Sequence, residues 1–264
     1  MSSIRPELIR PLPISAGSGL VIFGGKFFIC ADDEVSLLVT DLKGNDSYIR
    51  LWKKELPENP EKRKKKKPDL ESLFLDEHFL YALPSFSRKN RTEGARIELD
   101  KLGNVVDKKK IDLTQLYKSL NDIPDLNIEG AIKKDDKLIL FQRGNGEKGE
   151  NGLVILKDLE SKKFDFIPLE LPKVNDVQVS ITDAALHKGE IHFLAVAENS
   201  SSTYLDGKVS GAFIGKLSHH KVSSLTPIDF QGKPEGLAFD GDVMYFVTDD
   251  DSRDIPSRLF RYGS

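Results

Sequence analysis

The sequence predicts an all-β protein, a single β-propeller domain of five four-stranded blades that spans residues 1–264. Three observations support this fold: a short motif recurs along the chain, a turn signal follows each copy, and apolar strands follow each turn. Successive copies lie about 50 to 60 residues apart, a period typical of propeller blades. The copies begin at residues 17–20, 70–73, 128–131, 182–185 and 234–237.

Each copy is followed by two residues that suit a tight hairpin turn, because Gly, Asp and Asn accept the positive φ angles that such turns require. The next strand is a continuous apolar run, as expected for a strand buried on both faces. The turn pairs are Gly24-Gly25, Asp76-Glu77, Asp135-Asp136, Lys188-Gly189 and Asp240-Gly241. The strands that follow them are 27–31, 79–83, 138–141, 191–197 and 243–247.

Further strands complete each blade. Third strands are expected at 36–40, 95–99, 152–156, 212–216 and 258–262, and more polar fourth strands at, for example, 48–52 and 164–169. The fifth copy ends after its third strand, whereas residues 6–12 form a strand with no blade of its own. We expect 6–12 to pair with the last blade and close the ring, because closure removes exposed sheet edges. A six-bladed ring is the alternative, if one long insert hides a blade.

Three inserts interrupt the strands. Residues 112–120 show apolar residues at helical spacing behind Asp112, and predict a short packing helix. The Lys-rich run 61–68 is expected to be a solvated loop, although it could attract phosphate or another anion. The Gly-rich run 142–152 lacks the Gly-Lys-Ser/Thr of a phosphate-binding loop, so we interpret it as a mobile connection with Arg143 and Asn145 facing the site.

The composition narrows the class of protein. The formal net charge of −3 does not favour general nucleic-acid binding. The single cysteine, Cys30, cannot form an internal disulfide and is expected to be buried. No signal peptide and no apolar segment of membrane-spanning length is visible, so we expect a cytoplasmic protein without a membrane partner. A leader removed from the chain would leave the same sequence.

Two sets of polar residues recur with the repeat. The first set opens the innermost strand of each blade, and the second set ends the next strand. Both are expected on one face, around the central channel, because antiparallel pairing places the start of one strand beside the end of its partner. The first set is Ser18, Glu71, Glu129, Asp183 and Glu235, and the second is Asp32, Asp33, Ser85, Arg88, Arg143, Glu198, Asn199, Asp249 and Asp250.

Four carboxylates around one axis repel one another, and a bound cation, protonation or paired basic residues would relieve the repulsion. Converging oxygens suit a hard cation, calcium above all, whereas the five histidines show no spacing typical of zinc sites. The structural alternative is that these acids accept backbone N–H bonds from the adjoining blade and fasten the ring. The second set varies from blade to blade, which is more typical of a ligand site than of a repeated structural device.

Four short motifs resemble the esterase-like phytase and gluconolactonase-like group of β-propellers, together with uncharacterised bacterial families related to it. They are Glu235-Gly236-Leu237-Ala238-Phe239, Tyr245-Phe246-Val247-Thr248-Asp249-Asp250, Ile128-Glu129-Gly130 and Ser18-Gly19-Leu20. The resemblance covers the repeat scaffold through most of the chain. It implies calcium or another divalent metal in the channel and hydrolysis of phosphate esters or lactones.

By this resemblance the metal ligands would be Glu71, Glu129, Asp183 and Glu235, and the anion contacts would be Arg143 and Arg253. Arg88, from the second set, is a further candidate for substrate binding. The chain departs from the group at Ser18, where an acid would be expected, and it has no clear histidine base.

The sequence therefore predicts a metal-assisted hydrolase of a small anionic ester, phosphate ester or lactone. The metal would polarise a substrate oxygen and lower the pKa of a bound water, and Asp249 or Glu198 would act as general base. The rival hypothesis is a non-catalytic propeller that binds a ligand or a protein on the same face. The hydrolase hypothesis predicts that Glu129→Gln or Glu235→Gln lowers metal affinity without unfolding the protein.

Overall fold

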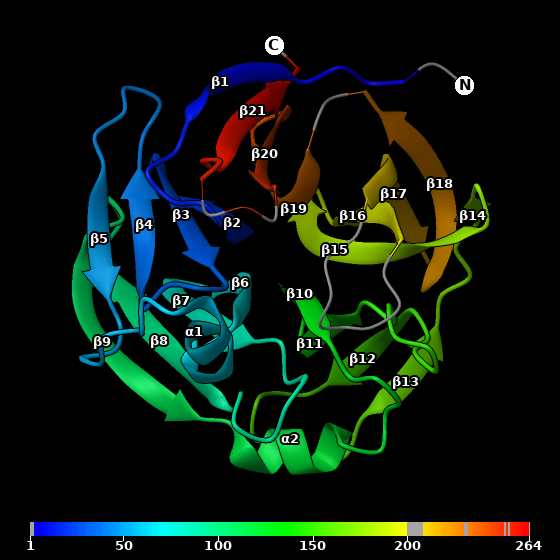
Figure 1. The fold of residues 1–264 in the computed structure, drawn as a ribbon, viewed down its shortest axis with the longest axis horizontal. Coiled ribbons are helices and arrows are strands. Elements are labelled where there is room, and N and C mark those ends of the chain that lie inside the picture. The colour runs from blue at the N-terminus through cyan, green and yellow to red at the C-terminus, as the bar shows by residue number, and fades with distance from the viewer. Residues whose placement is uncertain (1–2, 200–207, 230–231, 251, 253, 264) are drawn as a thin grey trace.

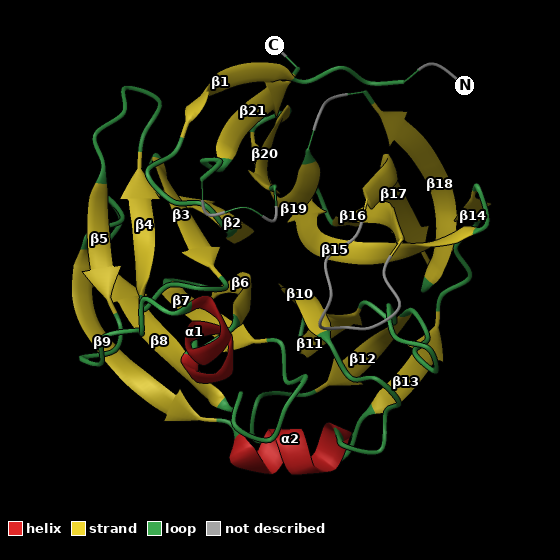
Figure 2. Ribbon diagram, in the orientation of Figure 1, coloured by secondary structure: helices red, strands yellow, loops and turns green. Residues whose placement is uncertain are grey.

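The computed structural model describes residues 3–199, 208–229, 232–250, 252 and 254–263 (Figure 1). Its strands form five antiparallel sheets arranged as blades around a central axis, and two short helices lie outside the sheets (Figure 2). The predicted five-bladed β-propeller is confirmed.

The blades follow one another along the chain, each with its innermost strand first. Blade 1 contains β2 (Gly17–Phe23), β3 (Lys26–Ala31), β4 (Ser36–Thr40) and β5 (Ser47–Arg50). Blade 2 contains β6 (Leu70–Asp76), β7 (Phe79–Pro84), β8 (Glu93–Leu99) and β9 (Val105–Asp112). Blade 3 contains β10 (Ile128–Lys134), β11 (Lys137–Gln142), β12 (Gly152–Leu156) and β13 (Asp165–Pro168).

Blades 4 and 5 depart slightly from this plan. Blade 4 contains β15 (Val177–His187), β16 (Glu190–Asn199), β17 (Lys208–Ser218) and β18 (Lys221–Ile228), and the two-residue β14 (Lys173–Val174) pairs with the start of β15. Blade 5 contains β19 (Lys233–Asp240), β20 (Val243–Asp249) and β21 (Arg258–Tyr262), and its outermost strand is β1 (Glu7–Pro11).

The ring closes through its first strand, as predicted. β1 pairs antiparallel with β21, with Glu7 opposite Arg261, and Figure 1 shows the two strands side by side. The segment before β1 also reaches blade 4, where the Ile4 N–H donates to the Pro227 carbonyl at 3.0 Å. The start of the chain therefore ties blade 5 to blade 4 and completes the last sheet.

The hairpins that open the blades follow the predicted turn chemistry. Positive φ angles occur in all five inner turns, at Gly24 and Gly25, Glu77, Asp135, Lys188 and Gly189, and Gly241. The first and second strands of each blade pair without a register shift from this turn to a point near the start of the innermost strand.

A β-bulge interrupts that register at the same place in every innermost strand. The extra residues are Glu71, Glu129, Thr182 and Glu235, and in blade 1 the pair Ser18-Gly19. A bulge turns its side chain away from the regular alternation of the strand. Glycine follows several of the bulges because the next blade comes very close: a Cβ on Gly130 would lie 2.9 Å from the Ala184 backbone nitrogen.

Apolar clusters fill the interfaces between neighbouring blades. Each blade contributes a fully buried aromatic or aliphatic residue from its second strand, for example Phe28, Phe141, Phe193 and Phe246. Cys30 is buried in the interface of blades 1 and 2, as expected, and the Gly19 N–H donates to its Sγ at 3.2 Å. The clusters hold the blades rigidly around the channel.

The helix predicted near residues 112–120 is confirmed as α2 (Thr114–Leu120). The Asp112 carboxylate accepts the Thr114 N–H at 2.9 Å, and Leu116 and Leu120 pack into the cluster between blades 2 and 3.

The prediction of a loop in the Lys-rich run is wrong, because residues 60–66 form the short helix α1 (Pro60–Lys66), labelled in Figure 1. The Asn59 side chain caps it and Pro60 starts it, a favourable first helical residue. Arg63 contacts the Asp33 carboxylate and backbone carbonyl, which relieves part of the repulsion within the run. In the described parts of the chain, neither helix has the length and apolar character needed to cross a membrane.

Candidate functional site

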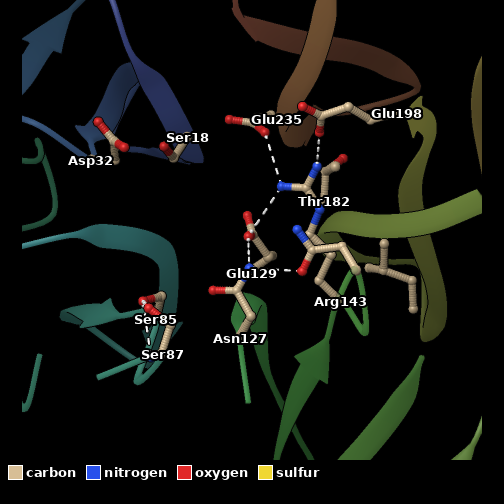
Figure 3. Close-up of polar contacts among 12 residues, drawn as sticks. Ser18, Asp32, Ser85, Ser87, Asn127, Glu129, Arg143, Thr182, Glu198 and Glu235 are labelled. Atoms are coloured by element: carbon tan, nitrogen blue, oxygen red, sulfur yellow. Dashed lines mark hydrogen bonds and ion pairs between the residues drawn. The ribbon is translucent and has the colours of Figure 1, made fainter. Parts of the chain in front are cut away.

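The channel opens on one face into a polar cavity of about 280 Å³, built by bulge residues and strand ends (Figure 3). Members of both recurring sets meet on this face, as predicted, but Ser18, Asp183, Ser85, Arg88, Asn199 and Asp250 are not among the described residues that line the cavity. The described residues that line it include eight acids, Asp32, Asp33, Asp69, Glu71, Glu129, Glu198, Glu235 and Asp249. They also include six bases, Arg63, Lys64, Lys67, Arg91, Arg143 and Lys233. None of the described lining residues is aromatic, so the cavity suits a strongly polar ligand.

Arg143 is the centre of one half of the cavity. Its guanidinium contacts Glu198 and lies 3.2 Å from Glu129 and 3.5 Å from Glu235 (Figure 3). The three glutamates come from blades 3, 4 and 5, and all are buried. Lys233 reinforces this half, because its Nζ lies 3.1 Å from the Glu235 carboxylate. Repulsion among these acids is thus relieved by paired basic residues, one of the three arrangements expected from the sequence.

Asp69 is the centre of the other half. Its carboxylate lies 2.6 Å from Arg91 and 3.1 Å from the Lys67 ammonium, and it accepts a hydrogen bond from the Ser85 hydroxyl. Lys67, which follows α1, also contacts Asp32. A positive φ of 63° at Asp69 turns the chain at this point.

Glu71 differs from the other acids of the cavity. Glu71, Asp32 and Asp69 form a cluster: one carboxylate oxygen from each residue lies within 4.8 Å of the other two. Yet Glu71 is only 8% exposed, and no described residue donates a hydrogen bond to it or forms an ion pair with it. Burial raises the pKa of Glu71 well above its usual range, and the carboxylates of Glu129, Asp69 and Asp32 raise it further.

Burial also raises the pKa of Glu129 and of Glu235, but there Arg143 and Lys233 oppose the rise through direct ion pairs. For Glu71 the opposing base is Lys67, which contacts other carboxylates. Either a proton or a bound cation would therefore balance Glu71.

Asp183 does not occupy the blade 4 position equivalent to Glu71, Glu129 and Glu235, although the sequence predicted that it would. The bulge residue of blade 4 is Thr182, so the predicted equivalence is wrong by one residue, and Asp183 does not line the cavity. Its carboxylate accepts the Leu237 N–H of blade 5 at 2.7 Å, the fastening role of the structural alternative. Burial raises the pKa of Asp183 well above its usual range.

The opposite end of the channel is apolar. A second hollow, of about 240 Å³, is lined by the later halves of the innermost strands, with Leu20, Leu73, Ala131, Ala184 and Leu237 among its residues. The bulges therefore separate two chemically different ends of one channel.

Comparison with known proteins adds the family. The model for a family of unknown function, DUF6929, matches residues 13–263. The chain belongs to this family. No curated protein sequence matches it.

Solved structures similar to this DUF6929 member are β-propellers with little sequence identity. Glutaminyl cyclase from Myxococcus xanthus has a TM-score of 0.55 at 13% identity, covering 99% of this chain and 98% of that one. A candidate glycosidase from Bacteroides thetaiotaomicron has a TM-score of 0.53 at 13% identity, covering 94% and 87%. At this identity the likeness supports the fold, and the resemblance to phytases and gluconolactonases stays a prediction.

The DUF6929 structure places the remaining predicted residues less centrally. Arg88 is not among the described residues that line the cavity, and Arg91 takes that place in blade 2. Asp250 pairs with Arg258 at 2.9 Å, away from the channel. Arg253 lies outside the described residues. Asn145 does line the cavity, as expected.

The sequence reasoning missed a third recurring set. The residue two positions before each bulge is Asp69 in blade 2, Asn127 in blade 3 and Lys233 in blade 5, and all three line the cavity. The Asn127 amide donates to Glu129 at 2.6 Å, so this position holds the bulge acid. Polar residues directly ahead of the motif were the available signal.

Proposed function

We propose that the polar end of the channel is the active site of a hydrolase of small esters or lactones that uses a hard divalent cation, calcium first. One observation carries the proposal: Glu71 is buried, faces the cavity beside Asp32 and Asp69, and has no partner among the described residues. Carboxylate oxygens that converge in this way are the ligands that calcium prefers.

The charge of the cavity supports a divalent ion. The described lining residues carry eight acids and six bases, an excess of two negative charges, which one divalent cation would neutralise. The residues that would hold it are Asp32, Asp69 and Glu71. Lys67 already contacts Asp32 and lies 3.1 Å from Asp69, so a cation would share these two carboxylates with its ammonium.

A cation held there would polarise an ester oxygen and lower the pKa of a bound water. The protein would supply the general base, and Asp249 fits that role. Asp249 bridges to Ala16, whose carbonyl accepts the Asp32 N–H at 3.1 Å, so the end of β20 lies next to the candidate ligands. Glu198 is less suitable because Arg143 holds its carboxylate in a buried ion pair.

The cation would also decide the substrate. Five bases of the cavity form ion pairs with its acids: Arg63, Lys67, Arg91, Arg143 and Lys233. Because these bases are already neutralised, the cavity without a cation does not favour a bound anion. With a divalent cation the cavity becomes neutral, and a small anionic ester, phosphate ester or lactone fits. The second candidate function is binding without catalysis, and the fastening roles of Asp183 and Arg143 favour it.

The test is thermal unfolding of EDTA-treated protein titrated with calcium. A ligand that binds only the folded state stabilises it, by about 2.7 kcal/mol at a concentration 100 times its Kd. The expectation from the sequence that Glu129→Gln lowers metal affinity is revised here, because Arg143 and Asn127 already contact that carboxylate. We expect the unfolding temperature to rise in the wild type and in Glu129→Gln, but not in Glu71→Gln. The two variants change the same position of the repeat, so Glu129→Gln controls for the loss of a channel carboxylate.

Esterase, lactonase and phosphatase assays of the calcium-loaded protein then separate catalysis from binding. A response to calcium without any turnover would favour the binding protein. A flat titration with calcium, magnesium and manganese would remove the cation, and Glu71 would then be balanced by a proton.

A further inference from the structure

A second candidate site lies away from the channel, on the face of blade 2 that meets blade 3. Four side chains stand in one row across the sheet there. Phe74 of β6 pairs with Tyr81 of β7, Tyr81 with Arg96 of β8, and Arg96 with Lys109 of β9. Residues paired in register share one face of a sheet, so two aromatic rings and two cations form a continuous strip.

The strip lines a crevice of about 540 Å³ between blades 2 and 3. The Phe74 and Tyr81 rings are stacked, with centroids 4.7 Å apart and planes 5° from parallel. The opposite wall includes Leu138 of β11 and Leu159. One part of the crevice is therefore aromatic and aliphatic, and Arg96 and Lys109 lie in the adjoining polar part. The polar part holds charges of both signs: Arg96, Lys109, Lys110 and Lys133, with Asp76, Asp112, Asp158 and Glu160.

Neither cation of the strip has an acidic partner among the residues that the structure describes. The Arg96 guanidinium lies over the Phe79 ring at 3.9 Å, and no described acid forms an ion pair with Arg96 or with Lys109. The acids nearest in register on this face are Asp76, Glu98 and Asp107, one cross-strand row away, and Asp76 also lines the crevice. Like charges directly opposite one another on a sheet are unfavourable, so Arg96 and Lys109 side by side weaken the fold unless an anion binds.

The same row of the repeat is neutralised in two other blades. In blade 5 the residue at the position of Arg96 is Arg261, and Glu7, directly opposite, lies 3.2 Å from it. In blade 4 the residue is Lys216, which lies 3.0 Å from Glu190. Blade 2 has Lys109 where blade 5 has Glu7. The residue directly opposite Arg96 is therefore a second cation and not an acid.

We propose that this crevice binds a small molecule that combines an anionic head, carboxylate or phosphate, with a planar apolar ring. The head would lie between Arg96 and Lys109 and replace the missing acid. The ring would lie against Tyr81 and the leucines of blade 3. This site is separate from the cavity of the proposed hydrolase and does not depend on a cation there.

The test is isothermal titration calorimetry in EDTA with three probes: phenylphosphonate, which has head and ring, methylphosphonate, which has only the head, and benzyl alcohol, which has only the ring. We expect phenylphosphonate to bind at least tenfold more tightly than either of the others. Arg96→Gln combined with Lys109→Gln should raise its Kd at least tenfold, and Tyr81→Leu should raise it severalfold.

Arg261→Gln is the matched control, because it removes the equivalent arginine of blade 5, and its Kd should stay within twofold of the wild type. Glu71→Gln should also leave the Kd unchanged, which separates this site from the channel. The Arg96 and Lys109 variants relieve repulsion, so they should fold and unfold at the wild-type temperature or above it. Undetectable binding of phenylphosphonate, unchanged binding in the double variant, or equal loss in Arg261→Gln would each overturn the proposal.

Discussion

The two halves of the polar cavity use the same position of the repeat in opposite ways. Glu129 and Glu235 are bulge residues of blades 3 and 5, and both contact buried bases. Glu71 is the bulge residue of blade 2, is also buried, and has no such partner among the described residues. The backbone geometry is shared, so the difference comes from the neighbouring side chains.

The comparison teaches that a base at the neighbouring position decides the role of the bulge acid. Blade 3 places Arg143 directly after its second strand, and blade 5 places Lys233 before its bulge. Blade 2 has Ser85 and Asp69 at these two positions, so Glu71 meets an acid instead of a base. Where the base is present, the acid fastens blades together, and where it is absent, the acid is available to a ligand.

The largest expected effect comes from removing the base of the paired half. Arg143→Met should leave Glu129, Glu198 and Glu235 close together without their shared counter-charge. Breaking a buried ion pair by removing one partner costs about 3–5 kcal/mol, so chemical denaturation should show a loss of that size. Arg143→Lys, which keeps the charge, should lose clearly less, and equal losses would show that packing rather than charge matters here.

Removing the base of the other half should cost less and should sharpen the contrast. Lys67→Met takes a cation away from Asp32 and Asp69, but Asp69 keeps Arg91 at 2.6 Å. We expect a loss of about 1–3 kcal/mol in the free energy of unfolding without calcium. Calcium should bind roughly tenfold more tightly, about 1.4 kcal/mol, because its competitor is gone. Unchanged calcium affinity would separate Lys67 from the candidate cation site.

Glu71 should reveal its raised pKa in the pH dependence of stability. Because its pKa is raised, Glu71 keeps its proton in the folded protein at pH values where the unfolded chain has released it. The contribution of Glu71 to the free energy of unfolding is therefore fully present below about pH 4.5, and it declines as the pH rises above that value. Glu71→Gln should remove that decline while changing the unfolding free energy by only about 1 kcal/mol or less. Unfolding temperatures measured from pH 5 to 8, without metal, test this, and identical slopes in wild type and variant would contradict it.

The smallest effect is expected from the exposed lysines of α1. Lys62 and Lys65 are exposed, and they differ in this from Arg63 and Lys67, which face acids. Lys62→Gln with Lys65→Gln should change the unfolding free energy by no more than about 0.5 kcal/mol. A larger change in denaturant titrations would mean that the exposed lysines of α1, and not only Arg63 and Lys67, stabilise the wall of the cavity.

The sequence predicts features that local chemistry determines. The turn residues Glu77, Asp135 and Lys188 adopt positive φ because neighbouring strands must reverse direction there, and the apolar runs beside them are visible without a partner. Ring closure by residues 6–12 follows from counting strands. The polar face of the channel follows from antiparallel pairing, which placed Arg143 correctly, and the interpretation of residues 142–152 as a connection facing the site placed Asn145 correctly.

The features that escaped prediction depend on contacts between distant segments. A bulge is a relation between two strands, so the sequence alone assigned Asp183 to a position that Thr182 occupies. The Lys-rich run looks self-repelling by itself, but Arg63 meets Asp33, thirty residues earlier in the chain, and a helix forms. The pairing of Arg143 with acids of three blades could not be separated from a ligand site by the residue types alone.

The closing strand sets the order in which the protein can assemble as it is made. Among the described strands of the propeller, β1 is the first to leave the ribosome and its partner β21 is the last, so Glu7 is made long before Arg261, its partner in the sheet. Four blades can form while blade 5 is still a fragment, with the apolar surface between blades 5 and 1 uncovered. Contacts so distant in sequence form slowly, and uncovered apolar surface favours aggregation in the meantime. Emergence of β21 is therefore the vulnerable step in closing the ring, since a chain without β21 leaves the apolar interface between blades 5 and 1 uncovered.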